Sequence, residues 1–260
     1  MKRMTKCWLL ALLGGTLHVQ AGYRPFTYTY DTYPMGQGNF EVEQWVTLKH
    51  HTGADSGYTR WDFREELEYG ATDKLRLALY LPSWQVEDSR DRHGARFDQV
   101  GLEAIYLLSN PITDPIGAGL YGEVNLGERG EVEGEIKLLL HKEIGDWTLA
   151  YNLLAETEVQ NVGRSGEHEK EGVLGHSLGI SCSLGAAWRV GGETVVETVI
   201  EDWRRYDHTT VYAGPVVSYQ GANLGQSQAT WWVTLTPTFQ LTSLEEEPDY
   251  VTRLIVGVSF

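Results

Sequence analysis

Long segments in which apolar and polar side chains alternate are the feature that most restricts the fold of this chain. In the clearest, Trp231–Leu241, every second side chain is apolar, and threonine and glutamine fill most positions between. A period of two residues is typical of a β-strand. Strands average about 5–6 residues in soluble proteins, whereas a tilted strand that crosses a bilayer needs about 9–11. Trp231–Leu241 is therefore predicted to cross a membrane.

The same alternation recurs and predicts an all-β fold, a transmembrane antiparallel up-and-down β-barrel of about 12 strands. The other expected strands are Phe40–Lys49, Tyr58–Tyr69, Leu75–Leu81, Phe97–Leu108, Ile116–Leu126, Glu131–Ile144, Trp147–Val159, Val173–Leu184, Trp188–Ile200, Thr209–Tyr219 and Tyr250–Phe260. Short connections such as Gly145-Asp146 tend to alternate with longer ones such as Pro82–Arg96. Because bacterial barrels place short turns in the periplasm and long loops outside, we expect both termini to be periplasmic.

Charged side chains on one face of several expected strands decide between a soluble sandwich and a membrane barrel. In Tyr58–Tyr69, charged residues from Arg60 to Glu68 alternate with aromatic and leucine side chains. A Lys or Arg on the lipid side of the bilayer midplane costs about 2–4 kcal/mol, so the charged face must line the lumen.

Gln44 and Glu65 do not follow this alternation, because both fall on the apolar side of their strands. The favoured interpretation is a β-bulge at Glu65-Glu66 that resets the alternation. The alternative is a protein-facing patch, as in an oligomer, and an oligomer remains open.

The two ends of the chain indicate export to the outer membrane. Residues 1–21 combine basic residues, a short apolar run and a small-residue ending, which predicts a signal peptide. That run is shorter than the ~20 residues of a membrane helix. At the other end, Leu254, Val256, Val258 and Phe260 are expected to form the signal that the barrel assembly machinery reads.

These limits predict three parts: the signal peptide, an aromatic N-terminal segment at 22–36, and an outer-membrane β-barrel at 37–260. The aromatic segment contains Tyr28, Tyr30 and Tyr33, and its pattern is compatible with a plug, a periplasmic tail or an additional strand. We expect the barrel to be an integral protein of the bacterial outer membrane, in contact with membrane lipid and lipopolysaccharide.

Composition excludes one class of partner and one kind of cross-link. The net charge is −15, with 36 acidic against 21 basic residues, so the chain would repel nucleic acid. Of its two cysteines, Cys7 lies in the signal peptide, and Cys182 alone cannot form an intrachain disulfide.

Three segments carry a resemblance to a known family: Asp31–Glu43 (DTYPMGQGNFEVE), Arg64–Leu75 (REELEYGATDKL) and Tyr212–Tyr219 (YAGPVVSY). They resemble a family of uncharacterised bacterial outer-membrane β-barrel proteins. The resemblance implies the same fold and location, and it implies no catalytic residues.

The sequence offers only weak matches to catalytic or metal-binding motifs. A lipid hydrolase needs a His and a nucleophile on one strand face, but His176 and Ser177 are adjacent and point to opposite faces. No spacing resembles a zinc site, and we expect no catalytic residue, no metal and no cofactor. The segment that begins at Glu193 looks like an energy-coupling box, but it lies inside an expected strand rather than before a plug domain.

Inward-facing charges are therefore the candidate functional residues. On the expected register, Glu68 and Arg76 flank the turn Gly70–Lys74, Arg64 lies near Tyr80, and Glu43 faces Arg64 across the first loop. The lumen-lining candidates are Glu43, Arg60, Asp62, Arg64, Glu66, Glu68, Arg76, Glu103, Glu123, Glu131, Glu133, Glu135, Lys137 and Arg253. Because acidic residues outnumber basic ones on these faces, we expect a narrow passive channel for small polar solutes that prefers cations. The alternatives are a closed barrel whose surface loops have binding or structural roles, and an outer-membrane lipid-modifying enzyme.

Overall fold

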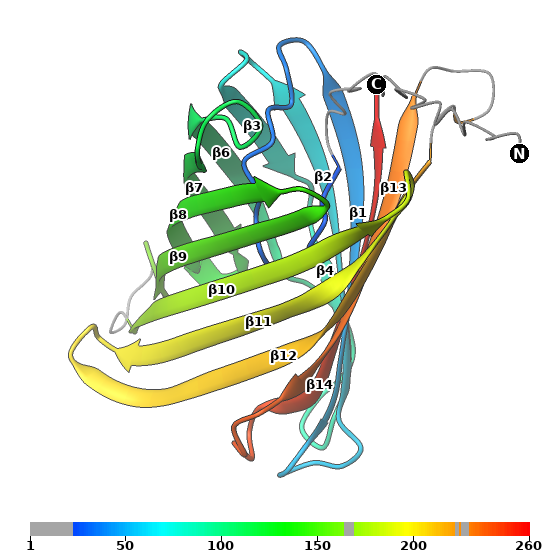
Figure 1. The fold of residues 1–260 in the computed structure, drawn as a ribbon. Coiled ribbons are helices and arrows are strands. Elements are labelled where there is room, and N and C mark those ends of the chain that lie inside the picture. The colour runs from blue at the N-terminus through cyan, green and yellow to red at the C-terminus, as the bar shows by residue number, and fades with distance from the viewer. Residues whose placement is uncertain (1–22, 164–168, 222–223, 225–228) are drawn as a thin grey trace, which may run out of the picture.

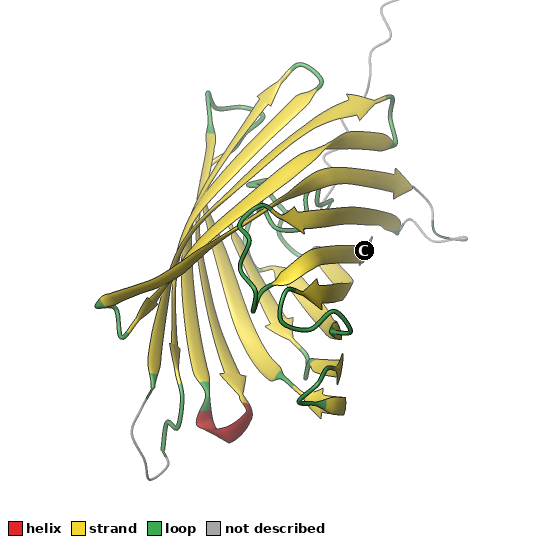
Figure 2. Cartoon of the chain, turned by 90° about the horizontal axis from the view of Figure 1, so that it is seen from below, coloured by secondary structure: helices red, strands yellow, loops and turns green. Residues whose placement is uncertain are grey.

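The computed structural model describes residues 23–163, 169–221, 224 and 229–260. The predicted signal peptide lies outside the described residues. Almost all of the wall is β-strand, and a 3-10 turn at Glu128–Gly130 is the one helical segment drawn in Figure 2. Among the described residues, no helix is long and apolar enough to cross a membrane. The strands are β1 (Phe40–Thr52), β2 (Thr59–Gly70), β3 (Leu75–Tyr80), β4 (Trp84–Asp88), β5 (His93–Phe97), β6 (Gln99–Ser109), β7 (Gly117–Gly127), β8 (Val132–Ile144), β9 (Trp147–Val159), β10 (Lys170–Leu184), β11 (Trp188–Glu201), β12 (Arg205–Gly221), β13 (Thr230–Gln240) and β14 (Pro248–Ser259).

The 14 strands form a closed antiparallel barrel whose wall has 12 strand positions, which confirms the predicted fold class. Each strand pairs with its neighbours, and β1 closes the barrel by pairing with both β14 and β2. Two positions are shared by two strands each. β3 and β4 pair in turn with the two halves of β2, and β6 and β5 pair with β3 and β4.

The expected loop Pro82–Arg96 is mostly strand, so that prediction was wrong. Trp84–Asp88 and His93–Phe97 form a hairpin that continues the barrel wall alongside β2. Pro82 breaks the ladder before this hairpin because proline has no backbone N–H. The alternation resumes beyond it, with Gln85 buried and Trp84 exposed.

The predicted bulge at Glu65-Glu66 was also wrong. β1 and β2 keep one continuous register, in which Gln44 is the partner of Glu65. The pairing is interrupted on the other side of β2, between Tyr80 at the end of β3 and Trp84 at the start of β4. Gln44 and Glu65 therefore lie side by side on the outer face, since the next residues along, Glu43 and Glu66, are fully buried inside.

Both described ends of the wall meet at the same end of the barrel (Figure 1). The amide of Phe260 donates to the carbonyl of Phe40 at 2.8 Å, and the amide of Phe40 donates in return at 3.4 Å. Short turns such as 145–146 lie at this end, which we call the terminal end. The connections at 53–58 and 241–247 lie at the other, the loop end.

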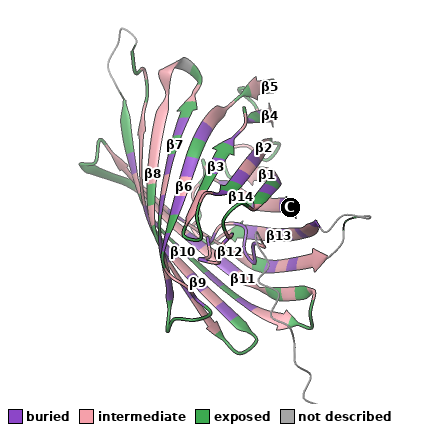
Figure 3. Ribbon diagram, turned by 90° about the horizontal axis from the view of Figure 1, so that it is seen from above, coloured by how far each residue is buried: buried purple, intermediate pink, exposed green. Residues whose placement is uncertain are grey.

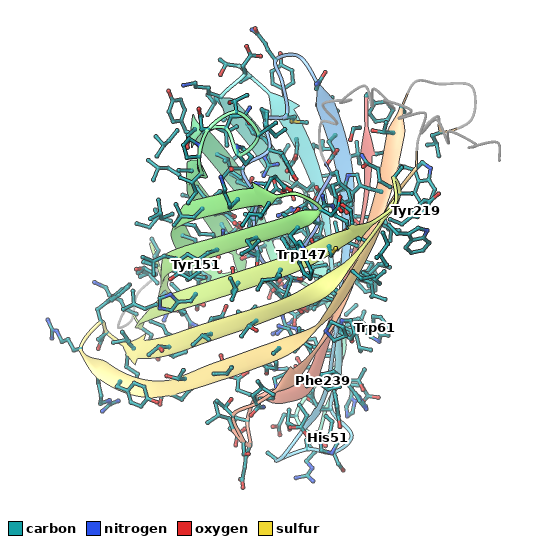
Figure 4. All side chains as sticks on the ribbon, in the orientation of Figure 1. His51, Trp61, Trp147, Tyr151, Tyr219 and Phe239 are labelled. Atoms are coloured by element: carbon teal, nitrogen blue, oxygen red, sulfur yellow. The ribbon has the colours of Figure 1, made fainter. Side chains whose placement is uncertain are left out.

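Aromatic side chains lie on the outer face toward both ends of the barrel: Figure 4 labels Tyr219 toward the terminal end, and Trp61 and Phe239 toward the loop end. Trp188 packs on Tyr219 toward the terminal end, with ring centroids 4.7 Å apart. Phe63 stacks on Trp84 toward the loop end at 4.2 Å. Such girdles flank the apolar band of membrane barrels. Buried and exposed residues alternate along the strands between them (Figure 3).

Candidate functional site

The aromatic N-terminal segment lies inside the barrel (Figure 1, dark blue). We call residues 23–36 the plug. It enters from the terminal end, where Tyr23 contacts Ser218 of β12, and reaches its deepest point near Tyr28. It then returns to Gly36, whose carbonyl lies beside Gly70 at the end of β2. Of the three conformations compatible with the sequence, the structure contains the plug.

Glu193 of β11 holds the plug by its backbone. Its carboxylate accepts hydrogen bonds from the amides of Thr27, Tyr28 and Thr29 at 2.9, 2.9 and 3.0 Å. The hydroxyls of Thr27 and Thr236 also donate to Oε2, at 3.2 and 2.6 Å. Charge-assisted bonds of this kind contribute about 1.5–3 kcal/mol each. The glutamate that looked like part of an energy-coupling box is thus the main anchor of the plug.

Two further wall residues fix the returning arm. The Asn152 side chain forms a pair of bonds with the backbone of Tyr30, accepting from its amide at 2.7 Å and donating to its carbonyl at 2.9 Å. The amide of Thr32 donates to Nδ1 of His141 at 3.3 Å. These bonds satisfy plug backbone groups that have no strand partner.

The plug fills the terminal half of the lumen. Phe26 is fully buried, and it lies so close to β10 that a Cβ on Gly179 would come within 2.7 Å of its ring. Tyr30 belongs to a buried apolar cluster that spans the lumen. Its other members are Trp45, Ile105, Leu107, Tyr121, Leu139, Trp232 and Ile255.

Charged side chains are buried in this filled half as well. Five glutamates face inward from β1, β2 and β6, and all are at most 3% exposed; they are Glu41, Glu43, Glu66, Glu68 and Glu103. Arg24 of the plug reaches Glu43 at 3.1 Å and Glu66 at 3.9 Å. Arg76 of β3 reaches Glu68 at 3.5 Å and Glu103 at 3.8 Å.

The loop half of the lumen is a cavity of about 620 Å³, which we call the vestibule. Tyr28 and Tyr30 of the plug line its inner end. Ten acidic residues line it: Asp62, Asp98, Glu123, Glu131, Glu133, Glu135, Glu156, Glu158, Glu197 and Glu247. Six basic residues do so too: Lys49, Arg60, Arg64, Arg96, Lys137 and Arg253. Fully ionised, these side chains carry an excess of negative charge.

Basic side chains at the floor of the vestibule lie on aromatic rings. The Arg64 guanidinium is 3.7 Å from the ring centroid of Tyr80 and 4.7 Å from that of Trp45. Arg253 lies 4.3 Å above Tyr28 of the plug. Cation–π contacts stabilise these cations, and both arginines line the vestibule.

The predicted lumen residues all lie on the inner face, but in two different environments. Nine line the vestibule: Arg60, Asp62, Arg64, Glu123, Glu131, Glu133, Glu135, Lys137 and Arg253. The other five lie in the filled half, where the four glutamates are buried and Arg76 is 14% exposed: Glu43, Glu66, Glu68, Arg76 and Glu103. Alternation indicates which face of the wall a residue lies on, but it does not indicate whether that residue lines the vestibule or lies in the filled half.

Sequence reasoning missed the residues that organise the lumen: Arg24, Asn152 and Glu193. Their contacts join positions far apart in the chain, so no local pattern marks them. Glu43 was expected to face Arg64 across the first loop. Instead, Glu43 pairs with Arg24, and the strand partner of Arg64 is Trp45.

The residues weighed for lipid hydrolysis lie on opposite sides of the wall. His176 is on the outer face, where its Nδ1 is 2.5 Å from the Tyr151 hydroxyl. Ser177 is inside and donates to Asn152 at 3.3 Å.

Comparison with known proteins agrees with this architecture. The COG4313 outer membrane channel from Pseudomonas putida F1 aligns with a TM-score of 0.61 at 14% identity, over 92% of this chain and 100% of that one. The NanC porin aligns with a TM-score of 0.54 at 12% identity, over 85% and 98%. No curated protein matches the sequence.

A family model, described as a family of unknown function (DUF6662), matches residues 18–250. This range contains the plug and nearly all of the barrel wall. The chain therefore belongs to the DUF6662 family, and its fold is that of an outer-membrane, channel-like β-barrel.

Proposed function

We propose that this protein is a narrow passive channel for small polar solutes and that it prefers cations. The observation that supports the proposal is the acid-rich vestibule, whose ten acidic side chains face six basic ones. A low-dielectric wall concentrates the field of such charges, so cations are drawn in and anions are repelled. The plug sets the width of the path at the inner end of the vestibule.

Three glutamates that line the vestibule provide the test. They occupy alternate positions, Glu131 immediately before β8 and Glu133 and Glu135 within it. Replacing the three with Gln should move the reversal potential of the purified protein in a planar bilayer toward zero under a salt gradient. The shift should be larger at low salt, where charges are screened less.

A matched control removes three acidic charges outside the vestibule. Asp91, Glu245 and Glu246 are exposed at the loop end and do not line the cavity. Their replacement by Asn or Gln should leave the reversal potential nearly unchanged. Equal shifts in the two triple variants would exclude the vestibule as the origin of selectivity.

A closed barrel is the second candidate, and the filled terminal half favours it. In that case the surface loops at 53–58 and 241–247 have binding or structural roles. Folded wild-type protein that passes no current would reject the channel and support this alternative.

We also propose that the terminal end faces the periplasm and that the assembly machinery recognises β14. Leu254, Val256 and Val258 lie on the outer face of that strand. Single cysteines introduced into a Cys182→Ser protein test the orientation. An impermeant thiol reagent should label Ser89→Cys, in the β4–β5 turn, on intact cells and leave Asp146→Cys, in the β8–β9 turn, unlabelled. The reverse pattern would place the terminal end outside.

A further inference from the structure

Two groups of three buried glutamates lie on the inner wall of the filled half and share one member. Glu41, Glu43 and Glu68 have carboxylate oxygens that all lie within 4.8 Å of one another, and so do Glu66, Glu68 and Glu103. Two oxygens bound to one Ca²⁺ at about 2.4 Å can be at most about 4.8 Å apart. Each group therefore meets the distance requirement for a shared cation, and Glu68 belongs to both.

Strand register forces these carboxylates together. Glu41 is the direct cross-strand partner of Glu68, and Glu43 is the partner of Glu66. Ala78 of β3 lies between Glu68 and Glu103 in the same row, and its small side chain leaves room for the two carboxylates to approach. Like charges in directly opposed positions destabilise a sheet unless something neutralises them.

Seven oxygen atoms of these side chains have no hydrogen-bond partner in the described part of the chain. They are both carboxylate oxygens of Glu66, both of Glu68, and Oε1 of Glu41, Glu43 and Glu103. Glu66 and Glu68 are 0% exposed, so bulk water does not reach them. A buried acceptor without a partner is costly, and a charged one more so.

Arginine neutralises this group only in part. The guanidinium groups of Arg24 and Arg76 lie within 4 Å of four of the five carboxylates, those of Glu43, Glu66, Glu68 and Glu103. Their approaches to Glu66 and Glu68 are 3.9 and 3.5 Å, too long for good hydrogen bonds. Arg64 is engaged elsewhere, with Glu123 at 3.5 Å. Three negative charges remain if all five carboxylates are ionised.

We propose that these glutamates form a buried Ca²⁺ site in the barrel wall, with Glu68 as the shared ligand. Ca²⁺ takes oxygen ligands in flexible geometry, and each group brings one oxygen from each of three carboxylates within reach of one ion. Mg²⁺ requires a near-ideal octahedron and keeps several waters, for which a fully buried cluster is poorly suited. Zinc sites use nitrogen and sulfur ligands far more often.

The ion would have a structural role. It would bridge β1, β2 and β6 at the level where Arg24 of the plug binds, and so stabilise the filled half. This role does not depend on conduction, so a failure of the channel proposal leaves the site untouched.

Calcium binding to the folded, chelator-treated protein in detergent tests the site. Isothermal titration in 150 mM NaCl, which weakens binding to surface charges, should show one Ca²⁺ per chain. Glu68→Gln should weaken that binding by at least about tenfold, because it removes a charged ligand common to both groups. Calcium should also raise the unfolding temperature of the wild type and not that of Glu68→Gln.

Glu158→Gln is the matched control, because Glu158 also faces the lumen but belongs to neither group. Its calcium affinity should equal that of the wild type. Glu103→Gln, a second ligand variant, covers the case in which Glu68→Gln lacks the gel mobility of a folded barrel. Folded wild-type protein that binds no Ca²⁺, or equal weakening in the control, would overturn the proposal.

Discussion

The two halves of the lumen have walls of the same alternating strands but hold their charges differently. In the filled half, Glu43 is 0% exposed and contacts Arg24 of the plug. In the vestibule, Arg60 and Asp62 pair at 2.6 Å with side chains that remain about one-fifth exposed. The strand pattern is continuous across the boundary, and the plug is what separates the two environments.

The difference shows that an inward charge has no single role in a barrel. Where the plug excludes water, a charge interacts strongly with its partner, and the loss of that partner leaves it unsatisfied. Where water enters, screening weakens each pair, and the summed field of many charges matters more. The vestibule is therefore suited to selectivity, whereas the filled half is suited to holding the structure together.

The largest expected effect comes from releasing the plug. Glu193→Ala removes the acceptor of three plug amides, and each buried amide left without a partner costs about 1–3 kcal/mol. The plug should leave the lumen, and single-channel conductance in a planar bilayer should rise severalfold. Glu197→Ala is the control, because Glu197 lies on the same face of β11 and, within the described part of the chain, makes no hydrogen bond to the plug.

Release itself can be measured separately from current. Thr29 is buried and lies in the plug, so Thr29→Cys in a Cys182→Ser protein should react with a thiol reagent only when Glu193 is also replaced. Labelling without any rise in conductance would show that the plug is not the constriction. The plug would then not account for the difference between the filled half and the vestibule.

A smaller effect is expected on stability when equivalent charges are removed from each half. Arg24→Ala should lower the free energy of unfolding by about 3–5 kcal/mol, because it leaves buried Glu43 and Glu66 without their cation. Arg60→Ala should lower it by about 0–1 kcal/mol, because its pair is partly exposed. Urea unfolding of both variants in detergent measures the two values. Similar losses would mean that the filled half is as wet as the vestibule.

Individual charge pairs show how far sequence reasoning reached. The Glu68–Arg76 pair was expected across the turn Gly70–Lys74, and the side chains are 3.5 Å apart. Arg64 was expected near Tyr80 and stacks on it. Both contacts join neighbouring strands, so register alone is enough to predict them. The pairing of Glu43 failed because its partner, Arg24, comes from a segment that belongs to no strand.

Local sequence patterns were enough to predict the barrel, its 12 strand positions, the inner face of the candidate lumen residues and the shared end of the first and last wall strands. These features follow from period-two alternation and turn length, which are local properties that a membrane enforces strongly. That residues 23–36 form a plug and divide the lumen depends on long-range contacts, which no local pattern encodes. The anchor Glu193 meets Thr27 across 166 residues of chain, and its own neighbours read as an ordinary strand. The sequence alone does not distinguish a glutamate that accepts hydrogen bonds from backbone amides from one that faces water.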